Sequence, residues 1–289
     1  WLLRDEAEAR NVRASLLDTP IWRQTPQGYL EPSSHRFADY VIAYDLLAAW
    51  SGLSAEDHAA IRGKIAAEAE HYHSVLEGGA VGGANYGNQR TLAASALGMA
   101  ALVLREYADS PNGPGKWLTA ALREIRREEN WWFFRPDGLF VEGLGYTGYM
   151  NCQFVPFAIA YERATGNYLF SDERLRQWLV FSCYQVLGNG DFTMWGTCES
   201  STGGLSYLAP MCNSRYGKDL APLFHRAFNL RPGAAPHPLH MHLALAHHDR
   251  EVAGAAPPAS AVFPLSQTVV LRESWEPEAV SVWFAGKDG

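Results

Sequence analysis

Apolar residues recur with helical spacing along most of this chain, from residue 1 to about residue 250. The predicted helices span residues 3–17, 35–50, 55–76, 89–108, 115–130, 145–165, 171–187 and 215–229. Ser54 and Ser171 each precede acidic residues and are predicted N-caps, while Gly166 and Gly188 are predicted helix ends. Helices joined by short Gly/Pro loops favour antiparallel hairpins. Such hairpins can stack as a bundle, a solenoid or a closed α/α toroid, and periodicity does not choose among them.

The helical pattern ends between residues 231 and 264, where PGAAPHP, GAAPP and AVFPL supply Pro and Gly breaks. Beyond this stretch, TVVLRESW and AVSVWFAG have the β-branched and aromatic composition of strands. Two strands do not form a stable sheet alone, so they either pack on the helical domain or begin a sandwich. The predicted organisation is a helical domain at 1–235, a linker at 236–262 and a β domain at 263–289.

Composition excludes several classes of function. A formal net charge of −7 argues against nucleic acid as a partner, since phosphate binding needs a basic surface. No apolar run approaches the ~18 residues of a membrane span. The first 17 residues are charged and helical, unlike a secretory signal. The four cysteines form no close CxxC pair, so we expect no zinc finger and mostly buried thiols, with a single disulfide as the alternative.

Residues 136–149, PDGLFVEGLGYTGY, are the strongest candidate for an active-site edge. The stretch places a carboxylate, Glu142, and two phenols, Tyr146 and Tyr149, on a glycine-rich turn that leads into a helix. These groups supply acid, base and hydrogen-bonding chemistry beside an open backbone. The structural alternative is a helix start with tyrosines in the core.

A second polar segment lies within residues 78–104, where a Gly-rich stretch precedes an Ala-rich helix. Its candidate functional residues are Asn85, Tyr86, Asn88, Gln89 and Arg90. Amides can hydrogen-bond a carboxylate, and Arg90 can bind one while the rest of the surface stays acidic. The alternative is an Asn/Gly loop that caps the helix.

A third candidate segment spans residues 187–204, a Gly-rich loop between predicted helices. Asp191, Trp195 and Glu199 are predicted to line sugar subsites, the tryptophan by stacking on a sugar ring. The alternative is an ordered connecting loop.

Histidines gather late in the chain. They are His237, His240, His242, His247 and His248, with Asp249 adjacent. Their spacing matches no specific metal motif, so a polar surface or an interdomain contact is favoured over a structural divalent metal.

Two of these segments resemble the heparinase II/III-like and alginate lyase group of polysaccharide lyases. DGLFVEGLGYTGY, followed by a helix that ends in the Ala-Thr-Gly of residues 164–166, is similar to the group's toroid domain. FPLSQTVVLRESWEPEAVSVWFAGKDG, residues 263–289, is similar to the first strands of its β-sandwich. The resemblance implies an incomplete α/α toroid followed by the start of an antiparallel sandwich, which we expect to be truncated in this chain.

The same resemblance implies β-elimination on a uronic-acid-containing glycan, with no required cofactor. Amides would neutralise the uronate carboxylate, and a tyrosine would remove the proton beside it and protonate the leaving oxygen. Tyr146 is predicted for this role, with Tyr149 as the second choice and Glu142 as an orienting group. Members of this lyase group carry an Asn next to a His. In this chain, either Tyr86 stands in the place of that histidine, or Asn88 and Gln89 form the equivalent pair. The native enzyme is expected to be secreted or periplasmic.

Three other functions stay open from the sequence. A glycoside hydrolase would need two carboxylates, which Glu142 with Asp191 or Glu199 could supply. A uronate epimerase would share the proton abstraction but leave the chain intact. A noncatalytic glycan-binding protein would use the same polar groups without turnover.

Overall fold

The structure of the protein is a computed structural model in which the chain is mainly helical, with one small antiparallel sheet. It describes residues 5–20, 31–78, 87–126, 135–139, 144–169, 173–186, 222–223, 226, 257–276 and 278–286. The helices are α1 (Glu6–Asp18), α2 (Glu31–Leu47), α3 (Ala55–Glu77), α4 (Asn88–Val103), α5 (Gly113–Ile125), α7 (Leu144–Thr165) and α8 (Glu173–Tyr184). The strands are β1 (Ala261–Phe263), β2 (Thr268–Arg272) and β3 (Ser281–Ala285). The predicted mainly α class with antiparallel strands is confirmed.

The chain divides into two compact units, each described by itself below. Unit 1 comprises Trp1–Arg127 with Arg163–Gly166, and unit 2 comprises Glu128–Glu162 with Asn167–Gly289. The predicted linker at 236–262 lies mostly outside the described residues, so it stays a prediction. Helices α1 to α5 contact one another and belong to unit 1.

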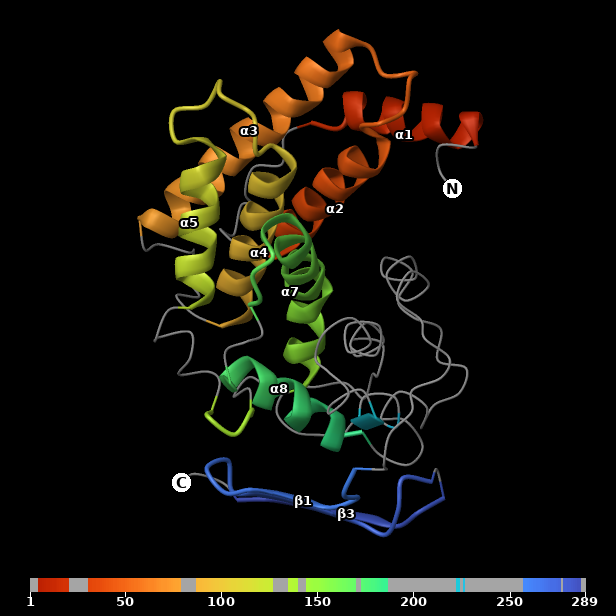
Figure 1. Cartoon of the computed structure of the whole chain (residues 1–289), viewed down its shortest axis with the longest axis vertical. Helices are drawn as coiled ribbons and strands as arrows, with labels where there is room; N and C mark the ends of the chain where they lie inside the picture. The colour runs from red at the N-terminus through yellow and green to blue at the C-terminus, as the bar shows by residue number, and fades with distance from the viewer. Residues whose placement is uncertain are drawn as a thin grey trace. The chain divides into compact units, whose positions relative to one another are not determined.

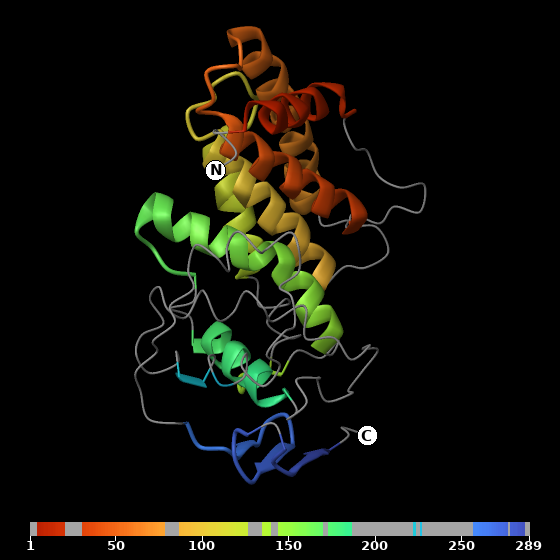
Figure 2. The same ribbon diagram turned by 90° about the vertical axis from the view of Figure 1, so that its right-hand side faces the viewer.

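Helix α4 is the centre of unit 1. It packs against α2, α3 and α5, and every residue from Asn88 to Ala101 is buried (Figures 1 and 2). Its sequence, NQRTLAASALGMAALV, is rich in Ala, which has the highest helix propensity and lets neighbouring helices approach closely. A helix that is apolar on all sides belongs inside a protein, which explains its central place.

Two predicted helix ends are confirmed. The Ser54 side chain accepts the Asp57 N–H while the Asp57 carboxylate accepts the Ser54 N–H, forming a capping box at the start of α3. Arg13 of α1 donates two hydrogen bonds of 2.8 Å to the same carboxylate, and together these contacts lower the pKa of Asp57 to about 2. Gly166, at φ +75°, ends α7. The predicted signals at Ser171 and Gly188 lie outside the described residues.

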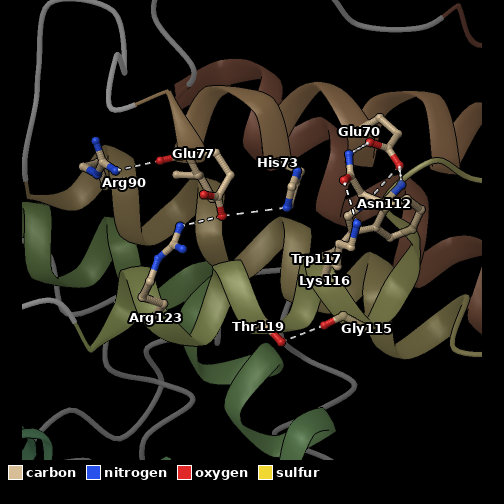
Figure 3. Close-up of polar contacts among 11 residues, drawn as sticks. Glu70, His73, Glu77, Arg90, Asn112, Gly115, Lys116, Trp117, Thr119 and Arg123 are labelled. Atoms are coloured by element: carbon tan, nitrogen blue, oxygen red, sulfur yellow. Dashed lines mark hydrogen bonds and ion pairs between the residues drawn. The ribbon is translucent and has the colours of Figure 1, made fainter.

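Glu70 of α3 joins that helix to the connection between α4 and α5 (Figure 3). Its carboxylate accepts hydrogen bonds from the Ser110 hydroxyl, the Asn112 backbone at 2.9 Å and side chain at 2.6 Å, and the Trp117 indole at 3.2 Å. Partial burial raises the pKa of Glu70, but the hydrogen bonds outweigh it and lower the pKa to about 2. One carboxylate therefore fixes how α5 begins against α3.

In unit 2, the three strands form a sheet in the order β1-β2-β3 with antiparallel pairing. Helix α8 covers one face, where Phe181 and Tyr184 contact Phe263 with ring centroids 4.7 and 5.9 Å apart. Strand β1 was not predicted, because Pro264 follows Phe263 directly and makes the AVFPL stretch look like a break in the sequence. The strand exists because Phe263 has a large apolar side chain to bury against α8.

Candidate functional site

Tyr146 and Tyr149 lie in the first two turns of α7, in unit 2. Tyr146 is 38% exposed and Tyr149 is half-buried. Residues three apart are neighbours on a helix surface, so the two phenols occupy adjoining positions on one side of α7. The exposure of Tyr146 leaves it accessible to a ligand, and its role in a site stays a prediction.

The turn before α7 has a structural role that the sequence did not indicate. The Asp137 carboxylate accepts hydrogen bonds from the Ser266 backbone N–H, at 2.8 Å, and from the Ser266 hydroxyl. Gly138 has φ +102°, and a Cβ there would lie 2.1 Å from the Gln177 carbonyl oxygen. Asp137 therefore holds the β1–β2 turn, and Gly138 allows the chain to pass against α8.

Asn88 and Gln89 form the start of α4, in unit 1. They are 6% and 8% exposed. Gly87, the N-cap at φ +80°, has no side chain to cap the first N–H groups, and the first turn carries no acidic residue. Side-chain amides beside the first N–H groups of a helix make an arrangement suited to an anion.

Arg90 is 2% exposed, and its charge is balanced inside unit 1. Its guanidinium donates two hydrogen bonds to the Glu124 carboxylate of α5, one of 2.6 Å, and one of 3.5 Å to the Leu76 carbonyl at the end of α3. This geometry favours a role in positioning the start of α4 over the direct substrate binding that the sequence analysis predicted. The charge does not face solvent.

Several other predicted site residues lie outside the described part of the chain. These are Asn85, Tyr86, Glu142, Asp191, Trp195 and Glu199. The two registers considered for the amide pair therefore both stay open. The amides of α4 belong to unit 1 and the tyrosines of α7 to unit 2, so each set is described within its own unit.

Gln153 is a candidate that the sequence analysis missed. It lies in α7 seven residues after Tyr146 and four after Tyr149, so helical geometry places it on the same side as both. The side chain is 5% exposed, and its amide nitrogen and oxygen have no hydrogen-bond partner in the described structure. The spacing of positions 146, 149 and 153 was the available signal, but a lone glutamine in an apolar stretch does not stand out.

Within the described ranges, no three His, Cys, Asp or Glu side chains come together as metal ligands, and the His237–His248 segment lies outside them. None of the helices that the structure describes combines the length and apolarity needed to cross a bilayer.

A cavity of about 210 Å³ adjoins the C-terminal end of α4, opposite the Asn88 end of the helix, and is lined by Arg62, Tyr107 and residues 103–106. Arg62 donates to the Tyr44 hydroxyl at 2.7 Å, and Arg105 lies 3.7 Å from Glu106. The cavity is therefore separate from the predicted amide site.

Compared with known protein families and with curated proteins, the chain matches no family model and no curated sequence. The candidate site therefore stands on its residues and their geometry.

Proposed function

We propose that this protein is a polysaccharide lyase that cleaves a uronic-acid-containing glycan by β-elimination. The observation that carries the proposal is the Tyr146 phenol, 38% exposed on the first turn of α7 with Tyr149 beside it. Elimination needs a base to remove the proton next to the uronate carboxylate and an acid to protonate the departing oxygen. In this proposal Tyr146 does both, and Tyr149 holds the sugar.

The start of α4 supports the second requirement of the reaction. Removing that proton adds negative charge to a group that is already anionic, so the carboxylate must be neutralised first. Asn88 and Gln89 lie beside the first N–H groups of α4, with no acidic residue in that turn to compete. We propose that these amides bind the uronate carboxylate, while Arg90 and Glu124 hold the helix start in place.

For the architecture we propose an incomplete α/α toroid followed by a β-sandwich. Consecutive helices α3, α4 and α5 pack against one another, as hairpins of a toroid would. The pairing register places Val262, Leu271, Val282 and Phe284 on the face of the sheet away from Phe263, and all four are exposed. An apolar outer face supports a second sheet packed over it.

The test is the ultraviolet absorbance of the unsaturated uronate product during incubation with alginate, polygalacturonate and chondroitin. We expect absorbance to rise with one of them and Tyr146→Phe to lower the rate by about 100-fold or more, because it removes the group that transfers the proton. Tyr168→Phe is the matched control, since Tyr168 is a similarly exposed phenol of unit 2 outside α7. Circular dichroism of each variant verifies that it is folded.

The products separate the competing functions. New reducing ends without the absorbance would indicate a hydrolase that uses Glu142 with Asp191 or Glu199. An altered uronate composition at constant chain length would indicate an epimerase. Binding without any product would indicate a glycan-binding protein.

A lyase acting on such a polymer would work outside the cytoplasm, so we propose a secreted or periplasmic location.

A further inference from the structure

Arg272 is a buried arginine at the end of β2 with an unusual set of partners. One of its terminal nitrogens, Nη2, donates to the carbonyls of Tyr184, at 3.4 Å, and Val186, which lie at the C-terminal end of α8. Its guanidinium carbon lies 4.4 Å from the centre of the Trp275 ring, and that indole is fixed by a 3.0 Å hydrogen bond to the Pro257 carbonyl. The guanidinium is therefore held firmly on two sides.

No described residue neutralises the other side of the guanidinium. Arg272 is 6% exposed, and its Nε and Nη1 atoms have no hydrogen-bond acceptor in the described structure. No carboxylate lies within ion-pair distance of it among the described residues. The helix carbonyls and the tryptophan ring offset only part of a buried unit charge. An unpaired buried cation is strongly destabilising, so an anion is expected beside it.

Burial also lowers the pKa of Arg272 from its usual value, which a neighbouring carboxylate would oppose. Arg226, also in unit 2, differs from Arg272 in its surroundings, because its side chain is half exposed and has the Glu276 carboxylate 3.9 Å away.

We propose that Arg272 is a substrate-binding residue whose Nε and Nη1 groups take a carboxylate of the polymer. The inference rests on the proposed function, which requires a polymer with a carboxylate on every uronate unit. A guanidinium suits this ligand because its donors are planar and fixed and it stays charged when buried. Its partner Val186 is the residue directly before the 187–204 segment, whose Asp191, Trp195 and Glu199 are predicted to line sugar subsites.

The experiment measures binding without turnover. Each variant is made in the Tyr146→Phe background, and calorimetry gives the affinity for oligosaccharides of alginate, polygalacturonate and chondroitin and for their carboxyl-reduced forms. We expect Arg272→Lys to weaken binding of one acidic oligosaccharide about tenfold or more, because lysine keeps the charge but loses the Nε and Nη1 donors. Binding of the carboxyl-reduced oligosaccharide is expected to stay unchanged. Arg226→Lys is the matched control and should alter neither.

The acidic-to-reduced ratio does not depend on the fraction of protein that is folded, so a loss of stability cannot imitate the effect. Equal weakening of both forms, an unchanged ratio, or no binding of any of these oligosaccharides overturns the inference. The ratio also allows the role of Arg272 to be tested independently of the proposed lyase activity. A changed ratio in a protein that never produces unsaturated uronate would keep Arg272 as a carboxylate-binding residue and remove the lyase.

Discussion

At the scale of single residues, the Arg90–Glu124 pair is expected to contribute most strongly to the stability of unit 1. Each side chain is at most 2% exposed, so removing one leaves the other as a buried charge without this ion pair. We expect Arg90→Met to lower the free energy of unfolding by about 3–5 kcal/mol, measured by urea denaturation.

Arg123→Met is the control for this substitution. Arg123 of α5 pairs with Glu77 at 2.6 Å, but both side chains are at least 40% exposed (Figure 3). An exposed pair contributes below about 1 kcal/mol, so this variant should unfold nearly as the wild type does. Equal effects of the two substitutions would mean that the burial of Arg90 does not set its contribution.

The role of Arg90 shows where residue-level prediction stops. The Ser54 cap was predictable because both partners lie within four residues. The partner of Arg90 lies 34 residues away in another helix, and an Arg beside Asn and Gln reads from the sequence as a surface group. The role of Asp137 was unpredictable for the same reason, since its partner Ser266 is 129 residues away.

At the scale of elements, Glu70 makes the α3–α5 contact sensitive to acid. Its pKa in the folded protein is about 2, below the ~4.3 of an unfolded glutamate. The stabilisation is therefore fully present above about pH 5 and is lost as the pH falls toward 2. We expect Glu70→Gln to cost about 1 kcal/mol at pH 7, a modest value because the carboxylate is partly exposed.

Urea denaturation at pH 7 and at pH 3 measures this dependence. The difference between wild type and Glu70→Gln should shrink at pH 3, because Glu70 is mostly protonated in the unfolded chain at that pH and must lose this proton on folding. Glu8→Gln, at an exposed position of α1, is the control and should match the wild type at both pH values. A difference that stays constant with pH would exclude Glu70 as the acid-sensitive group.

The helices themselves were predicted from the sequence far better than the sheet. Helices α3 and α7 were predicted to within one residue at each end, because apolar spacing and end signals agree there. Helix α4 begins one residue early and ends five early, since Leu104 already leaves the helix. A three-residue strand such as β1 has too short a pattern to recognise without its partner strand.

At the scale of the whole molecule, packing places the division of the chain at positions that composition does not mark. The boundary predicted at residue 236 from the Pro- and Gly-rich stretch stays a prediction, and the described residues show a division into compact units near residue 127. Which helices belong together depends on long-range contacts, such as those of α4 with α2, that a single sequence does not display.

The same division predicts that each unit responds to its own substitutions. Gly138→Ala should strain unit 2, because φ +102° and a 2.1 Å approach to the Gln177 carbonyl leave no room for a methyl group. We expect amide hydrogen exchange to accelerate in α8 and the three strands and to stay unchanged in α3, α4 and α5. Gly115→Ala is the matched substitution in unit 1. Gly115 lies in α5, and a methyl group added there would have no neighbouring atom within 4 Å.

Because alanine favours the helix, Gly115→Ala should slow exchange in α5 and leave α8 unchanged. The two variants differ from wild type by one methyl group each, so opposite and local responses would reflect where the group is placed. If Gly138→Ala instead accelerated exchange in α3, α4 and α5 as much as in α8, the units would open together. The amides of α4 and the phenols of α7 would then be coupled through folding stability.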